Sequence, residues 1–175
     1  LPGPAERVQR LGAVLAVVYL IFNEGHSAGS GAALLRPALC DEALRLARQL
    51  QHLLPVDGEV HGLAALLEIQ ASRLPARLDA DGRPVLLPDQ DRRLWDRLLI
   101  QRGLAALDRA LRLGEPGPYT LQASIAACHA RAARAQDTDW RAIVAGYDRL
   151  LALNPSPVIA LNRAMAVSFA VGPAA

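Results

Sequence analysis

Lysine is absent from this sequence, and all 19 basic residues are arginine. The 17 acidic residues are interspersed among them, which leaves a formal net charge of +2. A chain so close to neutrality lacks the long-range field that attracts nucleic acids through counterion release. Lysine-free usage that is rich in Ala and Arg is typical of a high-GC coding bias. We therefore interpret any single arginine as part of a solvated helix face.

Cysteines and aromatic residues are also few. The two cysteines, Cys40 and Cys128, lie far apart and form no C-x-x-C motif, which argues against a zinc site and fits a reducing cytoplasm. Aromatic residues make up 4% of the chain, whereas hydrophobic residues make up 52%. The abundant Ala, Leu and Arg favour helices over strands, and the hydrophobic content is ample for a core. We expect a helical, cytoplasmic domain.

A long hydrophobic run is missing as well. Residues 11–22 are apolar apart from Tyr19 and follow Arg7 and Arg10, a pattern that can be mistaken for a signal peptide. About a dozen residues are too few to span a bilayer, so a buried core helix is expected and no membrane contact. The chain also begins without Met, which we interpret as a sign of a fragment from a longer protein.

Hydrophobic periodicity and capping residues predict about seven helices and hardly any strand. These helices are expected at about residues 4–24, 38–54, 58–74, 91–113, 119–134, 139–153 and 157–171. Gly25 is expected to end the first helix in a left-handed conformation, and the all-round apolar surface of that helix indicates a central position. Asp57, Asp91 and the pair Asp137 and Thr138 are the expected N-caps of three helices. A flexible Gly/Ser/Ala-rich loop is expected at 26–33, and Asp-Gly predicts a small turn or hairpin near 77–88.

Amphipathic helices joined by short Pro/Gly turns are typical of stacked helical hairpins. We therefore expect an all-α fold of stacked antiparallel helical hairpins, a TPR-like right-handed superhelix, in a single domain over 1–175. Residues 1–88 are expected to form a family-specific helical part and loop, and residues 89–175 the TPR-like part. The last repeat is truncated, so its apolar face should be poorly covered.

Five segments carry a more specific resemblance. They are residues 14–25 (Val-Leu-Ala-Val-Val-Tyr-Leu-Ile-Phe-Asn-Glu-Gly), 89–96 (Asp-Gln-Asp-Arg-Arg-Leu-Trp-Asp), 117–123 (Gly-Pro-Tyr-Thr-Leu-Gln-Ala), 138–140 (Thr-Asp-Trp) and 155–164 (Pro-Ser-Pro-Val-Ile-Ala-Leu-Asn-Arg-Ala). In this order they resemble the TPR-like C-terminal extension of bacterial RNA polymerase sigma factors of the extracytoplasmic-function class, within the sigma-70 family. The resemblance covers nearly the whole chain. One departure is His26, where the motif more often continues with Tyr.

The resemblance implies a regulatory, protein-binding domain that modulates transcription initiation. The N-terminal sigma domains, which bind the polymerase core and read the promoter, are implied to lie outside this chain, so DNA would be contacted only through them. The implied protein partners are those sigma domains, the RNA polymerase core and a small YCII-like protein of the DGPF-containing type.

Polar residues beside small ones at helical spacing are the candidate binding positions. In a curled stack of hairpins they would line a concave groove and grip a peptide or neighbouring domain through directed hydrogen bonds. The candidates are Asn23, Glu24, Trp95, Gln122, His129, Tyr147, Asn162 and Arg163. The alternative for each is a structural link between helices, which is the commoner role of a polar group inside a stack.

Catalytic motifs are not found: the sequence contains no H-E-x-x-H, no G-x-S-x-G and no P-loop. We therefore expect neither an enzyme nor a cofactor or metal site. An alternative function is a small-molecule sensor with a ligand between helices near Gln122 and His129. A weaker alternative is a helical repeat that binds nucleic acid through its arginines.

Overall fold

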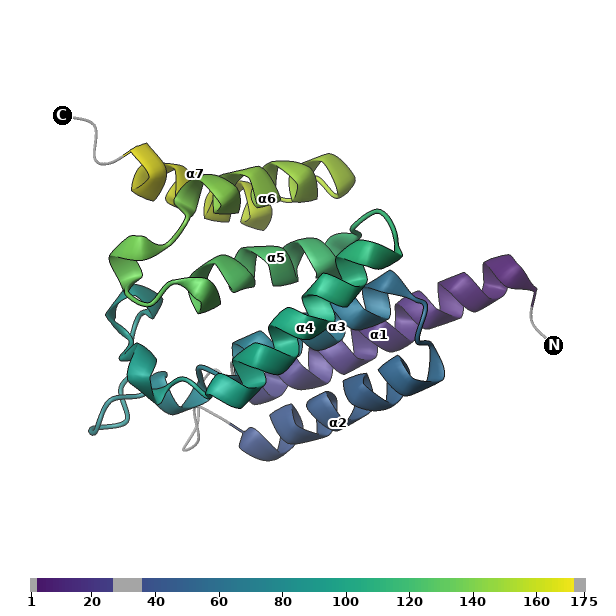
Figure 1. Ribbon diagram of the computed structural model, residues 1–175, viewed down its shortest axis with the longest axis horizontal. Helices are drawn as coiled ribbons and strands as arrows, with labels where there is room; N and C mark the ends of the chain where they lie inside the picture. Colours follow the sequence, from purple (N-terminus) through teal and green to yellow (C-terminus); the bar gives the residue numbers. More distant parts are fainter. Residues whose placement is uncertain (1–2, 27–35, 172–175) are drawn as a thin grey trace.

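The computed structural model describes residues 3–26 and 36–171. Within these ranges the chain has no strand and forms α1 (Pro4–His26), α2 (Pro37–Leu53), α3 (Gly58–Ala71), α4 (Arg97–Leu113), α5 (Pro118–Arg131), α6 (Trp140–Leu153) and α7 (Pro157–Val171) (Figure 1). This confirms the all-α prediction. None of the helices in the described part combines the length and hydropathy needed to cross a membrane. The loop predicted at 26–33 lies outside the described residues, apart from His26.

Neighbouring helices pack in sequence order, as stacked hairpins require. α1 packs on α2, α3 on α4 and α6 on α7, while α5 lies between α3 and α6 (Figure 1). Three hydrophobic clusters follow one another along the stack, built from α1–α3, from α3–α5 and from α5–α7. Because α3 and α5 each belong to two clusters, they connect the stack from end to end.

The central helix is α3, and the prediction that the first helix is central was wrong. Every residue of α3 is buried or half-buried, and the helix packs against α1, α2, α4 and α5. By contrast, α1 leaves Val14, Val17 and Leu20 exposed. The error arose because an apolar surface that wraps around a helix does not show how many neighbours cover it.

Gly25 does not end α1, which continues to His26. A Cβ atom at Gly25 would lie 2.8 Å from the Cys40 Sγ atom and 2.9 Å from the Arg36 carbonyl oxygen, closer than atoms can pack. The glycine therefore lets α1 and α2 approach each other, and its conformational freedom is not used.

Two of the predicted N-caps are wrong, because other residues cap α4 and α6. Asp91 caps only the short 3₁₀ turn Arg92–Leu94, and α4 begins after Asp96, whose carboxylate accepts hydrogen bonds from the amides of Leu98 and Leu99. Likewise, Asp139 rather than Asp137 or Thr138 caps α6. In both places two acidic residues stand near the helix start, and local sequence does not choose between them.

Two other predictions are confirmed. Asp57 caps α3 by accepting a 3.0 Å hydrogen bond from the amide of Val60. The turn near 77–88 is present, with a single antiparallel bridge between Leu78 and Pro84 and with Gly82 at φ +76°. The Asp79 carboxylate accepts hydrogen bonds from two amides within this turn.

The outer face of α7 is poorly covered, as the sequence predicts. Val158, Leu161 and Met165 remain 66%, 65% and 54% exposed. Among the residues of α7, only Ala166 is fully buried. The helix thus contributes little to the core of the described part of the chain.

The closest helix contact joins α3 to α5. A Cβ atom at Gly62 would lie 2.7 Å from the backbone nitrogen and 2.9 Å from the Cα atom of Thr120, so only glycine fits. One turn earlier, the Glu59 carboxylate accepts hydrogen bonds from the amides of Tyr119 (2.8 Å) and Thr120 (3.0 Å) and from the Thr120 hydroxyl (2.6 Å). Gly117 offers no side chain at the start of α5, so Glu59 supplies the cap from another helix.

Replacing Gly62 with Ala is expected to lower the free energy of unfolding by about 1–3 kcal/mol, because backbone must move to admit the methyl group. The matched control is Gly12→Ala in α1, where a Cβ atom meets nothing within 4 Å. That change should raise the free energy of unfolding by about 0.5–1 kcal/mol, because Ala favours a helix over Gly. Urea denaturation measures both. Equal stability of the two variants would contradict the close contact.

Candidate functional site

A cavity of about 540 Å³ lies between α1, α3, α5, α6 and α7. Five of the predicted groove residues line it: Asn23, Gln122, His129, Tyr147 and Asn162. They come from α1 and from the three consecutive helices α5, α6 and α7. The predicted helical spacing thus brings most of the candidate residues to one site.

Three predicted groove residues lie elsewhere. Glu24 pairs with Arg36 at the surface (2.9 Å), and Arg163 pairs with Asp148. Trp95 is only 3% exposed and belongs to the hydrophobic cluster of α3–α5.

Gln122 fits the structural alternative best. Its side-chain oxygen accepts a 3.3 Å hydrogen bond from the Tyr19 hydroxyl of α1, and its amide nitrogen donates to the Pro118 carbonyl (3.1 Å). Beside it, the rings of Tyr19 and Tyr119 meet edge to face with centroids 5.6 Å apart. Gln122 therefore joins α1 to α5 at the wall of the cavity.

Two arginines that the sequence analysis did not single out also line the cavity. Arg73 and Arg77 follow α3, flank the short 3₁₀ turn Leu74–Ala76 and are half-buried. Arg73 donates a hydrogen bond to the Gln70 side-chain oxygen, and Arg77 contacts the His26 Nε2 atom. Burial, together with the charges of Arg77 and Arg92, lowers the pKa of Arg73 to about 10. Both guanidinium groups are charged at neutral pH.

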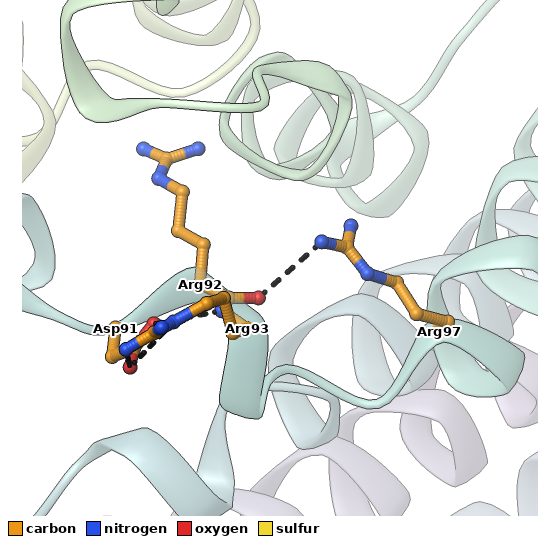
Figure 2. Close-up of polar contacts among 4 residues, drawn as sticks. All are labelled: Asp91, Arg92, Arg93 and Arg97. Atoms are coloured by element: carbon orange, nitrogen blue, oxygen red, sulfur yellow. Dashed lines mark hydrogen bonds and ion pairs between the residues drawn. The ribbon is translucent and has the colours of Figure 1, made fainter.

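Arg92 stabilises the C-terminal end of α5, next to the site. Its neighbour Arg93 turns back onto Asp91, whereas Arg92 points the other way, toward α5 (Figure 2). There Arg92 donates hydrogen bonds to the carbonyl oxygens of His129 and Ala132, which the end of α5 leaves unpaired. Its guanidinium also lies 4.8 Å from the centre of the Trp95 ring. Arg92 therefore has a structural role at the C-terminal end of α5.

Two histidines at the cavity stay neutral. Burial and the nearby charges of Arg77 and Arg73 lower the pKa of His26 to about 3. Burial and the charges of Arg73 and Arg92 lower the pKa of His129 to about 4. His26 stacks on Phe22, and His129 meets Trp140 edge to face. Neither ring is positively charged at neutral pH, so the positive charge at the cavity comes from the arginines.

The side chains around the cavity can make hydrogen bonds and ionic contacts with a bound molecule. In residues 3–26 and 36–171, no three His, Cys, Asp or Glu side chains are grouped so as to hold a metal ion. Burial raises the pKa of the Cys40 and Cys128 thiols, which keeps them protonated and poorly nucleophilic. Hydrogen-bond donors, aromatic rings and two cations remain at the cavity, and groups of this kind can bind and orient a molecule.

The sequence holds one signal that would have found the two arginines. No acidic residue occurs between Glu68 and Asp79, so Arg73 has no acidic partner within four residues, and the nearest acidic residues to Arg77 are Asp79 and Asp81. In a chain with 19 arginines that signal is weak, because the environment of each guanidinium depends on tertiary packing.

Comparison with known proteins places the chain in a family. A model described as "Family of unknown function (DUF6596)" matches residues 10–111. The chain belongs to this family. It is also 53% identical over 174 residues to an uncharacterized protein of Rhizobium meliloti (strain 1021). That match covers 99% of this chain and 41% of the relative, so the chain spans less than half the relative's length. No solved structure matches the chain.

The two neutral histidines predict a loss of stability in mild acid. An unfolded histidine titrates near pH ~6.5. Between pH ~6.5 and ~4 the unfolded chain therefore binds protons that the folded chain does not, and the free energy of unfolding falls as the pH decreases. His129→Gln should reduce the fall between pH 7 and pH 5 by on the order of 1–2 kcal/mol.

Urea denaturation at each pH measures this difference. His52→Gln is the control, because His52 is exposed on α2. The fall for this control should equal that of the unsubstituted chain. The prediction fails if the curves of the His129 and His52 variants have the same pH dependence.

Proposed function

We propose that this segment is a regulatory, protein-binding domain of an extracytoplasmic-function sigma factor. It modulates transcription initiation by contacting the sigma domains, the RNA polymerase core or a partner such as a YCII-like DGPF-type protein. Two observations support this: the ordered resemblance over residues 14–164, and membership of a family that forms the C-terminal region of some sigma-70 proteins.

The inner cavity is the observation that carries the proposal. Asn23 of α1 and Asn162 of α7 both line it, and Tyr147 lies half-buried at its wall. An amide and a phenol each donate and accept hydrogen bonds, so they recognise an extended peptide or a loop well. A concave surface lined in this way is how helical repeats hold protein segments.

Covalent tethering makes weak contacts sufficient. A domain joined to the sigma domains by a linker meets them at a high effective concentration. Docking on the same chain or on the polymerase therefore needs only a modest interface. A partner that occupies the cavity would release or strengthen this docking and so change transcription.

Deleting this segment from the full-length protein is expected to change transcription from its target promoter. Within the intact protein, Asn23→Ala and Asn162→Ala should shift output in the same direction by a smaller amount. The control is Arg141→Ala, an exposed residue of α6 outside the cavity, which should have no effect. A promoter–reporter fusion measures the output, and unchanged output from the deletion variant would refute the proposal.

A second candidate function is a small-molecule sensor. A volume of about 540 Å³ lies within the range of small-ligand sites, about 300–1,000 Å³, and the walls combine apolar and polar groups. Thermal denaturation in the presence of fractionated metabolites tests it. The sensor predicts a saturable rise in Tm with at least one fraction, and no rise with any fraction would exclude it.

A further inference from the structure

The cavity contains positive charge that the chain does not neutralise. The guanidinium groups of Arg73 and Arg77 contact only neutral groups by hydrogen bonding, the amide of Gln70 and the ring of His26. Within the described part of the chain, no carboxylate lies within 4.0 Å of either group. All 17 acidic residues fall in that part, since residues 1–2, 27–35 and 172–175 contain none.

The acidic residues nearest in sequence are already engaged. Asp79 accepts hydrogen bonds from two amides of the turn that follows Arg77. Glu68 pairs with Arg48 at 2.8 Å, on the α2 side of α3. Neither carboxylate reaches the cavity, so no acidic residue of this chain balances the two arginines.

A half-buried pair of like charges without a counter-ion is costly, because burial removes hydration and the two cations repel each other. Arg92 shows the contrasting case, since its guanidinium donates to two carbonyl oxygens at the end of α5. Arg73 and Arg77 each have a single neutral acceptor, the amide oxygen of Gln70 and the ring of His26. The fork of a guanidinium matches the oxygens of a carboxylate or phosphate, and such an oxyanion would offset the cost of both charges.

Part of the cavity wall is apolar and accessible. Tyr19, Leu87 and Ile159 line it and are only partly buried. A free inorganic ion would leave this surface uncovered. A molecule with an apolar body and an anionic end would cover it and meet the arginines at once.

We propose that the cavity binds a small organic anion, whose carboxylate or phosphate group is held by Arg73 and Arg77 and whose apolar part lies against Tyr19, Leu87 and Ile159. This inference rests on the second of the two proposed functions, the sensor. It is independent of docking on the sigma domains. The bound anion joins α1 and α7 to the turn after α3, so it stabilises the arrangement of the helices around the cavity.

Benzoate, phenyl phosphate and benzamide are suitable probes for thermal denaturation of the chain at constant ionic strength. Benzoate and benzamide have nearly the same shape and differ in charge. The proposal predicts a saturable rise in Tm with benzoate or phenyl phosphate and none with benzamide at the same concentration. This comparison uses the unsubstituted chain and does not depend on the folding of any variant.

Three variants locate the site. Arg73→Gln and Arg77→Gln should each weaken binding of the anionic probe at least tenfold, because a charge-assisted hydrogen bond is lost. Arg83→Gln is the matched control, since Arg83 is exposed in the same turn region and does not line the cavity. Binding to this control should be unchanged. Without a probe, the Arg73 and Arg77 variants should keep the Tm of the unsubstituted chain or exceed it.

Four results of these experiments would contradict the anion site, and each can be told from the others. An equal rise in Tm with benzamide and benzoate overturns the anion site but leaves the sensor in place. No rise with either anion overturns the anion site, and the sensor then stands or falls with the metabolite fractions. An equal loss of binding in the Arg83 variant shows a non-specific charge effect and overturns the site. A large loss of Tm in the Arg73 variant without a probe marks that arginine as structural and also overturns it.

Discussion

The docking of α5 on α3 is the contact on which the rest of the structure depends. Glu59 caps α5 from the first turn of α3, and Gly62 lets the two backbones meet at Thr120. α6 packs on α5 and α7 on α6, so the C-terminal half of the stack reaches the core through α5. α5 also forms part of the cavity wall, through Gln122, Ile125 and His129. A change at this contact would therefore affect both stability and the binding surface.

The distribution of carboxylates explains the charge of the cavity. Asp57, Asp96, Asp139 and Glu59 cap helices, and most other acidic residues pair with arginines at the surface. These uses stabilise the ends of helices, where unpaired amides need acceptors. They also leave no carboxylate for the inner side of the stack. The net charge of the chain thus says little about the cavity, because the local balance there is set by packing.

Sequence reasoning succeeded where the signal was local and unique. The helical class and the cap at Asp57 follow from periodicity and from a single capping residue. It failed where one local pattern serves two purposes: Gly25 can end a helix or admit a neighbour, and an acidic residue can cap a turn or a helix. At the site, helical spacing identified Gln122 and His129. It missed Arg73 because the absence of a partner is a property of the folded chain.

Amide hydrogen exchange in Glu59→Ala tests the central claim most directly, because it reports on the amides that Glu59 caps and on the helices behind them. The account predicts that the amides of Tyr119 and Thr120 lose protection, together with those of α5 that face the cavity, while the contact of α1 with α2 around Cys40 keeps its protection. Unchanged protection throughout α5 would show that the helix is held by other contacts and would contradict the account.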